Sequence, residues 1–249
     1  TQAVAEYSDR IEKMDEQEKK QAFEQAEKYN ETLISDPGRF TPTEEQDEWY
    51  KSLLDIDGTG MMGYITIPEI DCKLAVYHTV DDSVLQVGVG HMEGSSLPVG
   101  GSGTHCVLSG HRGLPSAKIF TDLDQMKNGD IFLIHVLGKT LAYKVDQIKT
   151  VLPEESSELD IIEGEDHVTL VTCTPYGVNT HRLLIRGIRT EYVEPEEEAE
   201  ETPIQQIAKV DPVKIMIIGL VAMVIMIIIV YIVIRRKSRK TEESSRKDE

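Results

Sequence analysis

The sequence predicts a mainly β domain with helical segments before it and a membrane helix after it. Residues 1–32 are rich in Glu, Lys, Gln and Ala, which is a helix-forming composition. Across residues 62–192, short β-branched runs alternate with Gly and Pro turn signals, a pattern typical of a closed barrel or a sandwich. Residues 215–234 are twenty residues without a charge, a length that crosses the roughly 30 Å hydrocarbon core of a bilayer.

The helix predicted over residues 1–32 carries few apolar side chains. Tyr7, Ile11 and Phe23 are among those spread thinly along it, so at most a narrow stripe contacts another part of the chain. We therefore expect a solvated helical region that spaces the β domain from the membrane. The chain begins at Thr1, and we expect a signal sequence or a first membrane span to have preceded it.

Residues 33–61 combine a loop with a connecting helix. Asp36, Pro37 and Gly38 form a turn signal, because proline fixes φ and glycine permits a positive φ. Thr43 is followed by a run of acidic residues, which is the pattern of a capped helix N-terminus. We expect this helix to end before the strand pattern begins.

Runs with the length and pattern of strands recur along the β domain. Their ranges are 64–67, 74–77, 87–90, 104–109, 130–136, 141–151, 168–172 and 183–190. A glycine-rich stretch at 97–103 lacks the Gly-Lys-Ser/Thr of a phosphate loop, which argues against nucleotide binding. Strands at this spacing, with few helices between them, leave a barrel and a sandwich as the two candidate folds.

Charge and cysteine content exclude several function classes. From residue 213 onward 8 basic and 4 acidic residues give +4, which leaves −22 for the rest of the net −18. Such an acidic body argues against nucleic-acid binding, which needs cationic side chains to neutralise phosphates. The three cysteines include no Cys-x-x-Cys pair, so a zinc site and a disulfide scaffold are not expected. We expect no cofactor and no metal.

The C-terminal part has the order of a membrane anchor. Residues 193–214 hold a like-charge run of glutamates interrupted by prolines, which predicts an extended acidic linker. The span at 215–234 follows, and a basic segment at 235–249 comes directly after it. The positive-inside rule places that tail in the cytoplasm and the acidic body on the extracellular face of the cell membrane.

A candidate reactive site lies where two strands meet. Cys173 ends one apolar run, a Pro-Tyr-Gly turn follows, and Arg182 opens the next run. A thiol beside a fixed positive charge is a plausible nucleophile, because a cation stabilises the thiolate. The best candidate for the proton donor is His111 in a Ser-Gly-His-Arg-Gly segment. From the residues alone, His105 and His181 stay open as alternatives.

The other two thiols have no such setting. Cys106 lies on an alternating strand and shares a face with Leu108, so we interpret it as a small buried hydrophobe. Cys72 lies near a strand start, and no residue near it suggests chemistry.

Three segments together resemble the sortases, the cysteine transpeptidases of Gram-positive cell surfaces. They are Thr169-Leu-Val-Thr-Cys173, Arg182 nine residues later, and Ser109-Gly-His111-Arg-Gly. The stretch Cys173-Thr-Pro-Tyr-Gly-Val-Asn-Thr-His-Arg182 resembles class C, the pilin-polymerising branch. The likeness covers about half of the chain, from residue 62 to 187. It implies that residues 62–192 form a catalytic eight-stranded sortase β-barrel.

The resemblance also implies a reaction and a role for each residue. Cys173 would attack a backbone carbonyl and form a thioester. His111 would protonate the departing amine, and Arg182 would stabilise the oxyanion. The substrate would be an LPXTG-like sorting signal, cut between Thr and Gly and passed to a lysine of a pilin subunit. The alternatives are a housekeeping sortase that uses a cell-wall amine and a non-catalytic, membrane-tethered binding module.

Class C sortases carry a lid with an Asp-Pro-aromatic motif, and residues 33–61 resemble it in part. Asp36 and Pro37 match that motif, whereas Gly38 stands in place of the aromatic residue. The likeness implies that Asp36 faces the catalytic arginine, and that Phe40 fills the groove over Cys173 instead. The alternative is a plain connector.

Overall fold

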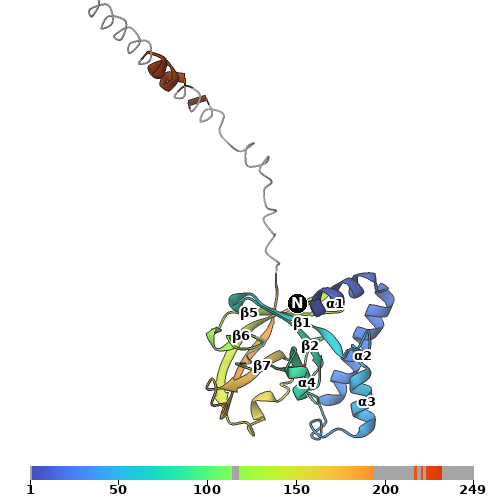
Figure 1. Ribbon diagram of the computed structural model, residues 1–249. Helices are drawn as coiled ribbons and strands as arrows, with labels where there is room; N and C mark the ends of the chain where they lie inside the picture. The colour runs from blue at the N-terminus through green and yellow to red at the C-terminus, as the bar shows by residue number, and fades with distance from the viewer. Residues whose placement is uncertain (1, 114–117, 193–215, 218–219, 221–222, 232–249) are drawn as a thin grey trace, which may run out of the picture. The chain divides into compact units, whose positions relative to one another are not determined.

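The computed structural model describes residues 2–113, 118–192, 216–217, 220 and 223–231. The chain divides into two compact units, Thr1–Tyr192 and Val193–Glu249. The first unit contains the β domain and the helices that precede it (Figure 1).

Eight strands of the first unit close into a barrel. They are β1 (Met61–Ile67), β2 (Cys72–His78), β3 (Val89–His91), β4 (Thr104–Ser109), β5 (Ile131–Val136), β6 (Lys139–Val151), β7 (Asp166–Thr174) and β8 (His181–Thr190). Their order around the barrel is β1-β2-β3-β4-β7-β8-β6-β5. The β2–β3 and β4–β7 pairs are parallel and the others are antiparallel. The prediction of a mainly β, eight-stranded barrel is therefore confirmed.

The barrel interior is filled by side chains, which is expected at this strand number. Phe132, Tyr143 and Ile185 are completely buried, and the rings of Phe132 and Tyr143 stack at 5.7 Å. Gly187 makes this stacking possible, because a Cβ at this position would lie 2.7 Å from the Phe132 ring. The barrel is thus a packed core, and a substrate must bind at its surface or its ends.

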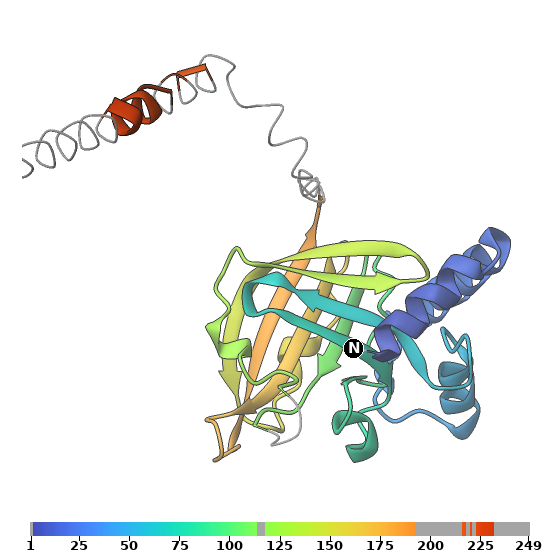
Figure 2. The same ribbon diagram turned by 45° about the horizontal axis from the view of Figure 1, so that its top comes forward.

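The N-terminal region forms two helices, α1 (Gln2–Lys13) and α2 (Glu16–Leu33), which lie against one side of the barrel (Figure 2). Asp15 caps α2 by accepting a hydrogen bond from the backbone of Gln17. The Tyr7 hydroxyl donates to the carbonyl of Met62 and accepts from the N–H of Leu137, both at 3.0 Å. The single helix expected over residues 1–32 is thus two helices, and the narrow apolar stripe, with Tyr7 and Ile11 buried, docks them on the β domain.

Helix α2 is also held through a buried amide. The Asn30 side chain donates to the carbonyl of Leu97 at 3.1 Å and accepts from the N–H of the same residue at 2.7 Å. Asn30 is 2% exposed, so these two bonds satisfy a polar group that would otherwise be costly to bury. They fix the end of α2, and with it the start of the loop that follows.

The connecting helix α3 (Glu44–Ser52) begins after Thr43, as the sequence predicts. Thr43 and Gln46 form a reciprocal capping box. Buried Tyr50 joins the helix to the barrel, since its hydroxyl lies 2.9 Å from His91 Nδ1. The remaining helical elements are short: η1 (Pro68–Ile70), α4 (Asp82–Leu85), η2 (Leu123–Gln125) and η3 (Ser157–Leu159).

The C-terminal predictions fall mostly outside the described residues. The acidic linker at 193–214 and the basic tail at 235–249 lie wholly outside them, and the span at 215–234 is described only at 216–217, 220 and 223–231. Within the described parts of the chain, no helix has both the length and the apolar composition that crossing a membrane requires.

Candidate active site

Cys173 and Arg182 are brought together by strand pairing. Strands β7 and β8 are antiparallel, and these two residues are direct partners in their register. Side chains alternate across a strand, so Val171 lies on the same face as Cys173, and Leu184 on the same face as Arg182. All four side chains line one cavity. The predicted adjacency of thiol and guanidinium is therefore a consequence of the sheet itself.

His111 reaches the same place from the parallel neighbour of β7. The chain leaves β4 beside Val171, whose carbonyl accepts a hydrogen bond from Gly110 at 3.0 Å. The Thr172 hydroxyl donates to the Gly110 carbonyl at 2.8 Å. Glycine is needed here, because a Cβ would lie 2.6 Å from the Phe120 ring. These contacts carry His111 into the cavity that Cys173 lines.

The cavity has a volume of about 310 Å³ and combines three reactive side chains with an apolar wall. His111, Cys173 and Arg182 line it together with the polar side chains of Ser109, Glu155 and Thr172. The apolar wall comprises Val80, Leu85, Met92, Val151, Leu152, Pro153, Leu159, Val171 and Leu184. This combination suits a peptide whose apolar residues bind the wall while one carbonyl lies at the thiol.

The guanidinium of Arg182 is oriented by backbone carbonyls. Its Nη1 donates to Asn179 at 3.3 Å and to His181 at 3.2 Å. These bonds engage a single nitrogen of the planar fork, and among the residues that the structure describes Nε and Nη2 form no hydrogen bond, so both can serve an oxyanion. Arg182 is half-buried, which strengthens such a bond relative to one in water.

An aspartate that no sequence motif identifies lies beside the candidate acid. Asp82 Oδ1, on α4, is 3.6 Å from His111 Nε2. The Asp82 side chain is 85% exposed and that of His111 is 30% exposed. Only the fold brings α4 to the end of β4, and the two residues are far apart in the chain.

The alternative histidines do not line this cavity. His105 is buried, with Nδ1 2.8 Å from the Asp160 carbonyl and Nε2 2.7 Å from the Thr169 hydroxyl. Burial lowers the pKa of His105 to about 4, which keeps it neutral near pH 7. The imidazole of His181 lies beside the Thr180 hydroxyl, at 2.9 Å.

The other cysteines are protected from ionisation. Burial raises the pKa of Cys72 to about 12, and burial raises the pKa of Cys106 well above its ordinary value. Cys173 is half-buried, whereas Cys72 and Cys106 are buried. Of the three thiols, Cys173 is therefore the one with access to a substrate.

The predicted lid residues lie outside the cavity. Asp36, Pro37 and Phe40 are not among the residues that line it. Asp36 accepts a hydrogen bond from the N–H of Gly38 at 2.8 Å, and in the described part of the chain it forms no ion pair with Arg182. Phe40 is 39% exposed and lies beside the guanidinium of Arg39, at 4.3 Å. The expectation that Phe40 fills the groove over Cys173 is not met, because the segment is held beside the cavity.

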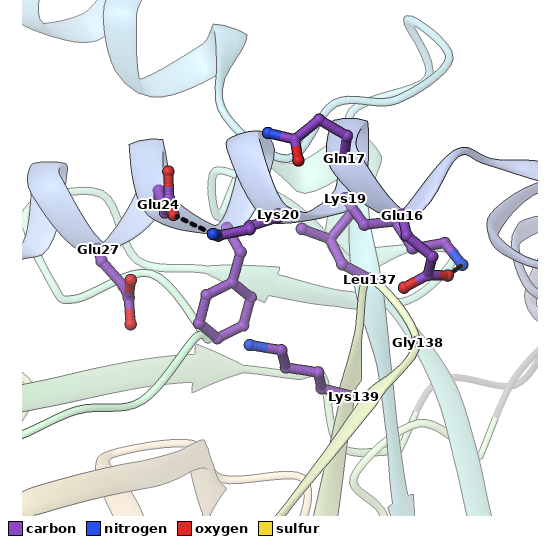
Figure 3. A pocket seen from close by; sticks show the side chains of 10 residues that line it. Glu16, Gln17, Lys19, Lys20, Glu24, Glu27, Leu137, Gly138 and Lys139 are labelled. Carbon is purple, nitrogen blue, oxygen red and sulfur yellow. Dashed lines mark hydrogen bonds and ion pairs between the residues drawn. The ribbon is translucent and has the colours of Figure 1, made fainter.

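A second cavity, of about 620 Å³, lies between α2 and the β5–β6 hairpin (Figure 3). Three lysines and three glutamates line it, namely Lys19, Lys20, Lys139, Glu16, Glu24 and Glu27. The ammonium of Lys139 lies 3.4 Å from the centre of the Phe23 ring. No cysteine or histidine lines this cavity, so it offers no nucleophile of the predicted kind. Across the described residues, no group of three or more His, Cys, Asp or Glu side chains could hold a metal.

Comparisons with known proteins give the same family for sequence and fold. A family model described as a sortase domain matches residues 65–190. The crystal structure of sortase C1 from Streptococcus agalactiae is 49% identical, with a TM-score of 0.76, and the match covers 78% of this chain and 100% of that one. The sortase C structure from Streptococcus pneumoniae is 40% identical, with a TM-score of 0.68. That match covers 78% of this chain and 100% of the other. Its description refers to catalysis and pilin substrate specificity.

The curated relatives are more distant. Sortase A of Streptococcus agalactiae serotype III (strain NEM316) is 29% identical over 130 residues, which are 51% of this chain and 52% of the relative. The chain spans between 52% and 61% of the length of the curated relatives that it matches.

Proposed function

The chain belongs to the sortase family, and we propose that it is a class C, pilin-polymerising sortase. It cleaves an LPXTG-like sorting signal between Thr and Gly and transfers the new acyl group to a lysine of a pilin subunit. The observation that carries this proposal is the convergence of His111, Cys173 and Arg182 on one cavity. The similarity to sortase C structures at 40% and 49% identity supports the class.

The first half-reaction forms a thioester. The Cys173 thiolate attacks the carbonyl carbon of the substrate threonine, and the charge that develops on its oxygen is stabilised by Arg182. When the C–N bond breaks, the imidazolium of His111 donates a proton to the departing glycine amine. Because Asn179 and His181 hold the guanidinium, little reorganisation is needed as the charge develops.

The second half-reaction resolves the thioester. The neutral amine of a lysine side chain attacks the same carbonyl carbon, and the C–S bond breaks to return the Cys173 thiolate. His111, now neutral, accepts the proton that the amine loses. An amide replaces the amide that was cut, so no external energy source is required.

The apolar wall is the place for the start of the sorting signal. Leucine and proline carry no charge and match the nonpolar side chains that line the cavity next to Cys173. A pocket of about 310 Å³ is near the lower end of the range for ligand sites, about 300 Å³. It accommodates a few residues, which agrees with recognition of a short motif.

We also propose that the enzyme is anchored in the cell membrane by residues 215–234. In this arrangement the barrel lies on the extracellular face, the linker at 193–214 spaces it from the bilayer, and the tail at 235–249 is cytoplasmic. The support is the uncharged length of the span and the basic residues directly after it, which favour this orientation. The enzyme would then meet its substrate on the extracellular face.

A competition between two acceptors separates this proposal from the housekeeping alternative. The full chain is incubated with an LPXTG-type peptide, a lysine-containing pilin peptide whose α-amine is blocked, and an oligoglycine that mimics a cell-wall amine. The proposal predicts a product joined through the lysine ε-amine. A product joined only to oligoglycine would favour the housekeeping function. No product with either acceptor, together with peptide binding that survives in Cys173→Ala, would favour a binding module.

A further inference from the structure

Arg39 is a buried arginine that lies outside the cavity yet bonds to two segments of its wall. Its side chain is 8% exposed. Nη1 donates to the carbonyl of Gly94 at 3.1 Å, and Nη2 donates to the carbonyl of Leu159 at 3.2 Å. Nη2 also lies 3.5 Å from the carboxylate of Asp160. A single guanidinium therefore joins the loop after α2 to the loops after β3 and β6.

The loop after β6 contributes Leu152, Pro153, Glu155 and Leu159 to the cavity wall. Between β6 and β7 its helical content is the single turn η3, which ends at Leu159. The Leu159 side chain is 7% exposed and packs in a cluster with Val107, Val151, Val171 and Leu184. Except for Val107, these residues line the cavity beside Cys173. The position of Leu159 therefore sets the shape of the apolar wall.

Two side chains hold this loop at adjacent residues. Arg39 binds the carbonyl of Leu159, and His105 Nδ1 lies 2.8 Å from the carbonyl of Asp160. Burial lowers the pKa of His105 to about 4, so near pH 7 it is a neutral donor to this carbonyl. Arg39 supplies the charged donors, and hydrogen bonds from charged groups are roughly twice as strong as neutral ones.

The conformation of the loop after α2 places Arg39 against the loop after β3. Asp36 accepts a hydrogen bond from Gly38, and the Gly38 carbonyl accepts from the N–H of Thr41 at 2.7 Å. Gly94 has a φ of +83°, and a Cβ there would lie 2.2 Å from the carbonyl oxygen of Arg39. The two backbones are thus in closer contact than any residue other than glycine permits.

We infer that Arg39 is a positioning residue for substrate binding: it fixes Leu159 and thereby the apolar wall that receives the start of the sorting signal. This inference rests on the proposed sortase function. The planar guanidinium reaches two carbonyls from different loops at once, which the single ammonium of a lysine does not reproduce. In this chain the loop after α2 contacts the cavity wall from its outer side, through Arg39. The sequence had predicted a lid in this loop that would enter the cavity.

The test is a double-mutant cycle in the full chain with Arg39→Met and Leu159→Ala. Arg39→Met raises KM for an LPXTG-type peptide by about 10-fold and changes kcat by less than about 2-fold, because the reacting groups stay in place. In the Leu159→Ala background, Arg39→Met has little further effect on KM, since residues that act through one another are not additive. Additive effects on KM, or a loss confined to kcat, would overturn the inference.

A second measurement does not depend on turnover. Hydrogen exchange of residues 152–165 becomes faster in Arg39→Met, because the loop loses the bond from Arg39 to the Leu159 carbonyl. The control is Arg10→Met, which removes an ion pair between α1 and Asp57 and leaves this exchange unchanged. Unaltered exchange in Arg39→Met overturns the inference even if KM changes.

The two measurements also keep the inference distinct from the proposed function. If the wild-type enzyme forms no thioester but exchange rises in Arg39→Met, the proposed function fails and the structural role of Arg39 stands. If Arg39→Met does not fold, the measurements of KM and of hydrogen exchange are made on Arg39→Lys and test the inference there. That variant keeps the charge, reaches one carbonyl, and is expected to show the same changes at smaller size.

Discussion

Cys173 and Arg182 are direct cross-strand partners in the antiparallel β7–β8 pair. Partners of this kind have Cα atoms about 4.5–5.5 Å apart. The pairing of the two residues is therefore set by the ladder of the sheet, while the Asn179 carbonyl in the turn orients the guanidinium. Within the turn, Tyr176 and Val178 are 60% and 64% exposed, so their side chains are accessible to a substrate.

Arg182→Lys should lose most of the activity although the charge is retained. Lysine lacks the planar guanidinium, which can bond to two backbone carbonyls and to the oxyanion at the same time. We expect kcat to fall by about 100-fold or more, the range for loss of one oxyanion donor. Steady-state peptide transfer measures this, with Arg186→Lys as the control, because Arg186 pairs with Asp146 on the barrel surface. A kcat within threefold of wild type for Arg182→Lys rules out the oxyanion role.

His111→Gln should abolish both half-reactions, because glutamine can neither donate nor accept a proton at neutral pH. We expect kcat to fall by at least about 100-fold, which is the lower range for general acid–base catalysis. His181→Gln, in the alternative histidine next to Arg182, should leave kcat within about threefold. Single-turnover measurement of thioester formation separates the two outcomes. A larger loss in His181→Gln than in His111→Gln would reassign the acid.

Asp82→Asn should have only a small effect. Its carboxylate lies 3.6 Å from His111 but is 85% exposed, and exposed ion pairs contribute about 0–1 kcal/mol. We expect kcat/KM to change by less than about fivefold, and the change to shrink as salt is added. Measurement at low and high ionic strength checks this. A loss of about 100-fold in kcat/KM would contradict this prediction and show that Asp82 is an essential partner of His111 despite its exposure.

Acid should destabilise the fold through two buried histidines. Burial lowers the pKa of His91 to about 3 and of His105 to about 4. The unfolded state has the ordinary value of about 6.5, so below that pH it binds more protons than the folded state. This stabilisation is complete above about pH 6.5 and is lost as the pH falls toward 4 for His105 and toward 3 for His91.

At pH 5 each of these histidines costs about 2 kcal/mol of stability, which corresponds to roughly 5 °C in Tm. Thermal unfolding of the wild type and His105→Gln from pH 7 to 5 measures the effect. The variant should have a lower Tm at pH 7 and a shallower dependence on pH. Parallel curves for the two proteins would assign the acid sensitivity to other groups.

Local patterns account for what was predicted from the sequence. The strand runs have their own turn signals, so the barrel followed from short-range information and from the family resemblance. Cys173 and Arg182 flank one turn, and antiparallel pairing across a short turn places such residues side by side. The capping pattern after Thr43 predicted the start of α3 correctly, because the capping box is a contact between near neighbours in the chain.

Long-range packing accounts for what was missed. Residues Tyr7 and Asn30 dock the N-terminal helices by bonds to residues 55 and 67 positions away, and a thin apolar stripe does not identify such partners. The wall of the cavity is assembled from segments between Val80 and Leu184. In the sequence Arg39 is a charged residue without a motif around it, and only its contacts with Gly94 and Leu159 distinguish it.

Intact-mass spectrometry of the full chain with an LPXTG-type peptide, beside Cys173→Ala and the matched control Cys72→Ala, tests the central claim most directly. We expect an adduct with the mass of the peptide cut after threonine on the wild type and on Cys72→Ala. An added lysine amine should release it. No adduct on the wild type, or an adduct that persists in Cys173→Ala, would contradict the assignment of Cys173 as the nucleophile.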